Sequence, residues 1–66
     1  MAAVWQLEMT WPRGGETFLS LVREFGGELV AENRATFARY RAAEICAQLL
    51  HQRSGRAPSL SLVLQA

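Results

Sequence analysis

Hydrophobic and polar residues alternate near both ends of the 66-residue chain. A period of two places the apolar side chains on one face of an extended segment, so residues 4–11 and 59–64 are predicted to be half-buried β-strands. Pro12-Arg13-Gly14-Gly15 follows the first segment and is typical of a turn. The last strand has three possible neighbours: the first strand, the third strand, or the matching strand of a second subunit. The alternating apolar residues are Trp5, Leu7, Met9 and Trp11 in the first segment and Leu60, Leu62 and Leu64 in the last.

The segment between residues 17 and 33 is compatible with two structures. Phe18, Leu21, Val22 and Phe25 have helical spacing, and the glycine at position 26 would end such a helix in the left-handed conformation. The alternative is a β-hairpin in which residues 18–25 and 28–33 flank the glycine pair. A three-residue loop over residues 25–27 separates the charged side chains from most of the apolar ones, so we favour the hairpin. In that register Phe18, Val22 and Val30 remain on the outer face of the sheet.

A helix is predicted from about Phe37 to Arg53, where one stripe of residues is apolar and the opposite side is polar. Thr36 is a suitable N-cap, and Ser54-Gly55 followed by Pro58 is a stop signal. The expected apolar stripe consists of Ala38, Ala42, Ile45, Cys46, Leu49 and Leu50.

Together these elements predict one small α+β domain over residues 1–66, a small antiparallel sheet of order βββαβ with one long helix packed on one face. The run FLSLVREF, the pair GG, the strand ELVAEN and the helix TFARYRAAEICAQLL resemble one unit of the YegP-like small proteins. The closest matches are Gly27-Glu28 and Phe37, whereas that family typically has an Asn-Gly hairpin and often two units in tandem. The resemblance implies a βββα unit without an established biochemical activity, and it carries over no catalytic residue.

Composition limits the possible partners and ligands. Seven basic against six acidic residues leave a formal charge of +1, too small for broad binding to a nucleic-acid backbone, although local contacts stay possible. One cysteine forms no internal disulfide, and with a single histidine it leaves a four-ligand zinc site out of reach within one chain. We therefore expect no metal and no cofactor.

No apolar run approaches the roughly 20 residues that span a bilayer, and residues 1–5 lack a secretory signal, so we expect a cytoplasmic protein without membrane contact.

The chain shows no pattern that favours an enzyme. Glu24, Glu28 and Glu32 fit the solvated face of the predicted hairpin, and neither glycine pair has the spacing of a phosphate-binding loop. Cys46 lies on the apolar stripe, where a thiol acts as a small hydrophobic group, although a nucleophilic cysteine is the alternative. His51 falls in the last helical turn, where it can interact with exposed carbonyl groups.

Two features suggest binding to a macromolecule. Arginines surround two aromatic residues between positions 34 and 41, an arrangement that can contact an anion or simply pair with Glu32 and Glu44. The outer face of the sheet would also be apolar, and Trp5 and Trp11 supply more apolar area than we expect a single helix to cover. We therefore expect a non-enzymatic protein-interaction module that forms a homodimer, of the kind a phage or mobile element encodes to bind and block a larger host complex. The alternative is a nucleic-acid-binding module. The candidate partner-binding residues are Phe18, Val22, Val30, Arg34, Phe37, Arg39, Tyr40 and Arg41.

Overall fold

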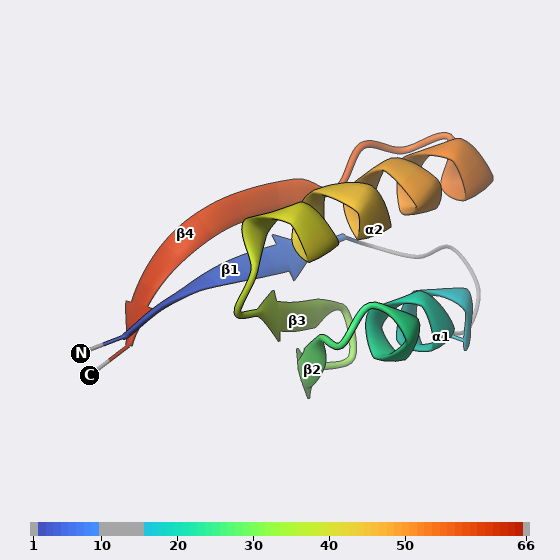
Figure 1. Cartoon of the computed structure of the whole chain (residues 1–66). Helices are drawn as coiled ribbons and strands as arrows, with labels where there is room; N and C mark the ends of the chain where they lie inside the picture. The colour runs from blue at the N-terminus through green and yellow to red at the C-terminus, as the bar shows by residue number, and fades with distance from the viewer. Residues whose placement is uncertain (1, 10–15, 66) are drawn as a thin grey trace.

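The computed structural model describes residues 2–9 and 16–65, which form a four-stranded antiparallel sheet and two helices (Figure 1). The strand order across the sheet is β2 (Glu28–Ala31), β3 (Arg34–Phe37), β1 (Ala2–Glu8) and β4 (Ser59–Gln65). A helix follows β1 and another follows β3, and in each case a strand lies between the two strands that the helix connects. This βαββαβ connectivity is the split βαβ, or ferredoxin-like, arrangement. The two helices are α1 (Glu16–Glu24), between β1 and β2, and α2 (Tyr40–Ser54), between β3 and β4.

The prediction of a strand over residues 18–25 is wrong, because these residues lie in α1 and its C-terminal cap. Gly26 adopts a φ of 77°, and its N–H donates a hydrogen bond to the carbonyl of Arg23 at 3.1 Å. The N–H of Gly27 donates to the carbonyl of Val22 at 2.8 Å. These two bonds form a Schellman motif, so the glycine pair ends a helix and does not turn a hairpin.

The hairpin is instead formed one element later, between β2 and β3. Thr36, predicted as a helix cap, lies inside β3, where it is opposite Gln6 of β1 and Glu28 of β2. The second helix consequently begins at Tyr40, and its N-cap residue, Arg39, makes no side-chain capping bond. The observed order is therefore βαββαβ, not βββαβ, and the βββα unit implied by the family resemblance does not occur among the described residues.

Both strands predicted from alternation are present. β1 covers residues 2–8, and the remainder of the first predicted strand, including Trp11, lies largely outside the described residues. β4 pairs along its whole length with β1, which decides among the three possible neighbours. The end of α2 also agrees with the prediction, since Gly55 has a φ of 73° and its N–H donates to the carbonyl of His51 at 2.8 Å.

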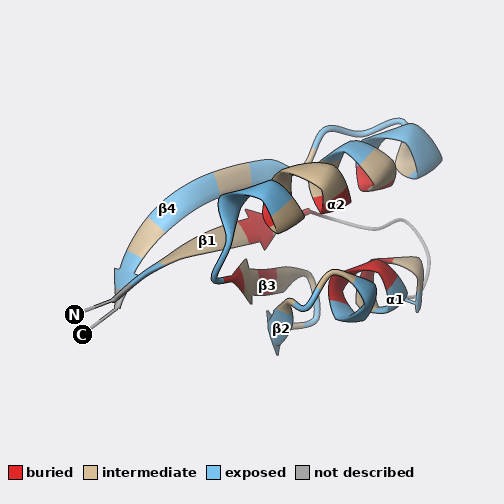
Figure 2. Ribbon diagram, viewed as in Figure 1, coloured by how far each residue is buried: buried red, intermediate tan, exposed pale blue. Residues whose placement is uncertain are grey.

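The core lies between the two helices and one face of the sheet (Figure 2). Alternate residues of β1 and β3, including Leu7 and Ala35, point into this core, while Gln6 and Thr36 lie on the opposite face. The prediction that Phe18 and Val22 lie on the outer face of the sheet is thus wrong. Three candidate binding residues belong to the core, because α1 turns two of them toward the sheet and β3 turns the third toward the helices: Phe18, Val22 and Phe37.

Candidate protein-interaction surface

Strands β1 and β4 extend beyond the helices as a two-stranded ribbon that carries both ends of the chain (Figure 1). β3 ends at Phe37, which is opposite Trp5, so the residues that precede Trp5 in β1 pair only with β4. Leu62 is the β4 partner of Trp5, and Leu64 lies closer to the tip. These two leucines are 53% and 70% exposed, because the core ends before the ribbon does.

Tyr40 links this ribbon to the first turn of α2. Its ring contacts Trp5 edge to face, with the ring centroids 4.7 Å apart and the ring planes at 62°. The Tyr40 hydroxyl donates a hydrogen bond to Glu44 Oε2 at 2.9 Å, one turn along the helix. That bond, together with the negative charge of the carboxylate, raises the pKa of the Tyr40 phenol above its ordinary value.

These side chains form a continuous series on the helix side of the ribbon. Leu62 and Leu64 have the same parity along β4 as Leu60, which is opposite buried Leu7, so all three face the helix side. Trp5 is half-buried beneath the exposed ring of Tyr40. We call Trp5, Tyr40, Leu62 and Leu64 the ribbon strip.

The predicted arginine-aromatic cluster is not one surface. Arg34 and Phe37 lie on opposite faces of β3, since their positions in the strand differ by three, which is an odd number. Arg34 Nε lies 3.7 Å from Glu8 Oε2 on the outer face, which is not the pairing with Glu32 or Glu44 that the sequence suggested. Arg39 and Arg41 are exposed beside the start of α2.

Val30 is 53% exposed on β2, at the edge of the sheet opposite β4. The structure therefore distributes the eight candidate residues over four places: the core, the outer face, the β2 edge and the start of α2. Of these residues, Tyr40 alone belongs to the ribbon strip.

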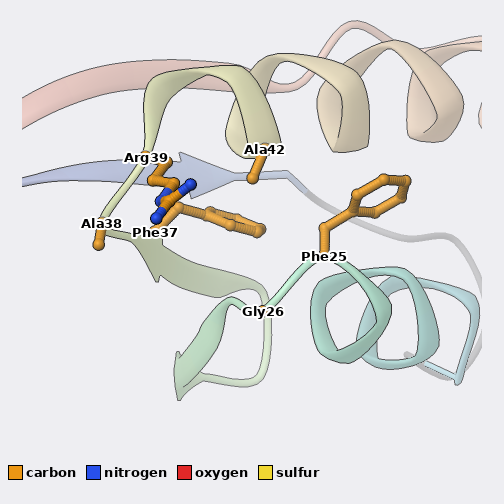
Figure 3. A pocket seen from close by; sticks show the side chains of 6 residues that line it. All are labelled: Phe25, Gly26, Phe37, Ala38, Arg39 and Ala42. Atoms are coloured by element: carbon orange, nitrogen blue, oxygen red, sulfur yellow. The ribbon is translucent and has the colours of Figure 1, made fainter.

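A small pocket of about 200 Å³ lies where the end of α1 meets the start of α2 (Figure 3). Arg39 supplies the only charged side chain in its lining. Drug-sized ligand sites usually occupy roughly 300–1,000 Å³ and combine several polar groups, so this pocket lacks the size and polar groups of a typical substrate site. The lining residues are Phe25, Gly26, Phe37, Ala38, Arg39 and Ala42.

Cys46 is fully buried, and this desolvation raises the pKa of its thiol to about 11, with a further contribution from the negative charge of Glu24. A thiol in this state is a poor nucleophile at neutral pH. His51 is exposed in the last turn of α2, five residues away from Cys46. Residues 2–9 and 16–65 contain no group of three or more His, Cys, Asp or Glu side chains that could hold a metal ion.

Sequence reasoning missed the exposure of Leu62 and Leu64, although it assigned them to the correct strand and face. The alternation of β4 predicts that all three leucines turn inward, but it does not show where the core ends. The start of α2 at Tyr40 and the length of the ribbon leave Leu62 and Leu64 uncovered, and no capping side chain at position 39 marks that helix start in the sequence.

Neither α1 nor α2, the helices of the described residues, has the length and apolar character needed to cross a membrane. In comparisons with known proteins, no family model, no curated protein and no solved structure matches this chain.

Proposed function

We propose that the protein is a non-enzymatic protein-interaction module that binds a larger protein through the ribbon strip. The observation that supports this most strongly is the grouping of exposed apolar side chains at one end of the molecule. Leu62, Leu64 and Tyr40 are 53%, 70% and 45% exposed, and they adjoin the indole of Trp5. Contiguous exposed apolar residues on a small protein typically mark a contact site, and aromatic residues contribute much of the binding energy in such sites.

The charges near the strip favour a partner with acidic residues. Arg39 and Arg41 flank Tyr40 in the chain, and both are exposed. A partner surface with an apolar centre and acidic residues at its rim would match this arrangement. The inhibitor role expected from the sequence stays a prediction.

The nucleic-acid alternative has weaker support. Single-stranded nucleic acids bind to exposed aromatic platforms flanked by basic grooves. Here the outer face of the sheet carries Gln6, Glu8 and Thr36, and Phe37 is buried. The arginines near the helix start therefore lack the sheet platform that such binding uses.

Capture of partners from a bacterial lysate by the tagged protein, with and without nuclease, tests the proposal. We expect a near-stoichiometric protein that survives nuclease and is lost from the Leu64→Asp and Tyr40→Ala variants. Val30→Asp is the matched control, because Val30, at 53%, is also an exposed apolar residue but lies at the other edge of the sheet. Circular dichroism of each variant checks that it is folded.

Two results would overturn the proposal. Captured proteins that disappear on nuclease treatment, with binding that falls steeply as salt rises, would place the nucleic-acid alternative first. Binding that is unchanged in Leu64→Asp and Tyr40→Ala would show that the ribbon strip is not the contact surface.

A further inference from the structure

Among residues 2–9 and 16–65, no strand pairs with the edge of β4 that faces away from β1. β4 is the terminal strand of the sheet, and all seven of its residues pair with β1 on one side. In an antiparallel strand alternate residues direct both their N–H and their C=O groups to the same side, so the other side of β4 has groups available to a further strand.

The two edges of the sheet differ in how they are protected. β2 has four residues, begins with Glu28, is followed by Glu32 and has an irregular register between Leu29 and Ala31. Short length, charge and a bulge are the usual devices that prevent pairing with another strand. β4 has seven residues and contains neither a charged residue nor a proline. A long edge without these devices is suited to receive a partner strand.

The sequence of β4 is complementary to itself. Around Leu62 the strand reads as a near palindrome, with Leu60 and Leu64 on either side and polar residues at both ends. A two-fold axis between antiparallel strands stands perpendicular to the sheet, so it preserves the two faces and brings each leucine opposite a leucine. With the two-fold axis beside Leu62, all seven residues of each β4 strand have a partner in the other copy. Ser61 then lies opposite the partner's Val63 on the outer face.

We propose that the protein forms a symmetric dimer in which β4 pairs antiparallel with β4 of a second copy, centred on Leu62. The two four-stranded sheets would join into one continuous sheet, and the uncharged strand lets two copies meet without repulsion. Because the axis keeps both helical layers on the same side, the two ribbon strips would lie side by side and double the apolar surface. The role of this dimer rests on the proposed function, whereas the strand pairing is tested separately.

Cysteine cross-linking tests the position of the axis. Residues opposite each other in an antiparallel pair have Cα atoms about 4.5–5.5 Å apart, within the range of a disulfide. A cysteine at position 62 would meet its own copy, whereas two cysteines at position 64 would be about 14 Å apart, four residues along the strand. We expect Leu62→Cys to cross-link in oxidised glutathione at least about ten times faster than Leu64→Cys.

Leu64→Cys is a stringent control, because Leu64 is the more exposed residue and random collision would favour it. The unmodified chain should not cross-link, since its single cysteine, Cys46, is buried. Equal cross-linking of the two variants, or faster cross-linking of Leu64→Cys, would overturn the proposed register.

Sedimentation equilibrium tests the dimer itself. We expect the unmodified chain to show a mass of twice 7.4 kDa. Two double variants, Ser61→Lys with Val63→Lys and Ser61→Glu with Val63→Glu, should each be monomeric alone and form a mixed dimer when combined. Mixing also distinguishes a variant that has lost only its strand pairing from one that is unfolded, because an unfolded variant would not form the mixed dimer.

A mass of 7.4 kDa at all protein concentrations, or double variants that do not combine, would overturn the dimer. Neither result would overturn the proposed function, which is judged by the Tyr40→Ala capture, because Tyr40 lies outside β4 whereas Leu64 belongs to the pairing strand. Conversely, a dimer that captures no protein would leave the pairing in place and remove the interaction module.

Discussion

The replacement of Gly27 by alanine tests how closely the cap of α1 packs on the core. A Cβ atom at this position would lie 2.6 Å from Cε2 and Cζ of Phe37 and 2.9 Å from Cγ1 of Val22. Ordinary van der Waals contact begins at 3.4 Å, so the Phe37 ring would have to move by roughly 0.8 Å in a close-packed interior. Phe37 is only 2% exposed, which leaves its ring little room.

The expected cost follows from two opposing effects. Overpacking of a core by one methyl group typically costs about 1–3 kcal/mol. Gly27 does not have a positive φ, so alanine suffers no left-handed strain and gains about 0.4–1 kcal/mol from the restricted unfolded chain. We expect Gly27→Ala to lower the free energy of unfolding by about 1–2 kcal/mol, a large part of the roughly 3–10 kcal/mol typical of a domain of this length.

Urea titration followed by circular dichroism, at one fixed protein concentration, measures this free energy. The contact with the Phe37 ring is isolated by repeating Gly27→Ala in a Phe37→Leu background, because leucine lacks the Cε2 and Cζ atoms. In that background the alanine should cost at least about 1 kcal/mol less, as expected for residues in direct contact. An equal cost in both backgrounds, or no cost in the unmodified chain, would refute the assignment of the clash to Phe37.

Three further predictions concern other parts of the fold. Burial raises the pKa of the Cys46 thiol from 9.0 to about 11 in the folded state, so the contribution of this group to stability should be constant below about pH 8 and fall through pH 9–11. Urea titration at pH 10.5 should show a loss of about 2 kcal/mol that is absent from Cys46→Ala. Gly55→Ala should cost about 1 kcal/mol because of its positive φ, and Gly55→Asn less, as measured by thermal unfolding; equal costs would contradict the role of the left-handed cap. Glu8→Gln should change the free energy of unfolding by less than about 1 kcal/mol, since both side chains of the pair with Arg34 are more than 40% exposed, and a larger effect would show an additional role for Glu8.

Much of the local structure was predictable because its cause is local. The alternation around Leu7 and that around Leu62 each place one face of a strand toward the core, and the structure contains both strands. The stop signal at Gly55 is equally local, since a glycine can take the left-handed conformation that ends a helix.

The identity of residues 16–25 was not decided by the local pattern. Phe18, Leu21 and Val22 have helical spacing, yet a glycine pair after an apolar run is typical of a hairpin as well. The helix forms because it buries these three side chains against the sheet while the glycine pair satisfies its last carbonyl groups. β3 was missed for a related reason: four residues are too few for a periodic signal, and their pairing with β1 and β2 defines the strand.

The sequence alone therefore predicts the two long strands, most of α2 and the left-handed Gly55, since these depend on periodicity and backbone conformation. The tertiary structure alone decided which strands are neighbours, where α2 begins and which apolar residues stay exposed. The ribbon strip is the clearest case, because Leu60 and Leu64 belong to the same alternating series and face the same side. Leu60 is half-buried because its partner in β1, Leu7, belongs to the core, whereas Leu64 is exposed because the strands continue beyond the helices.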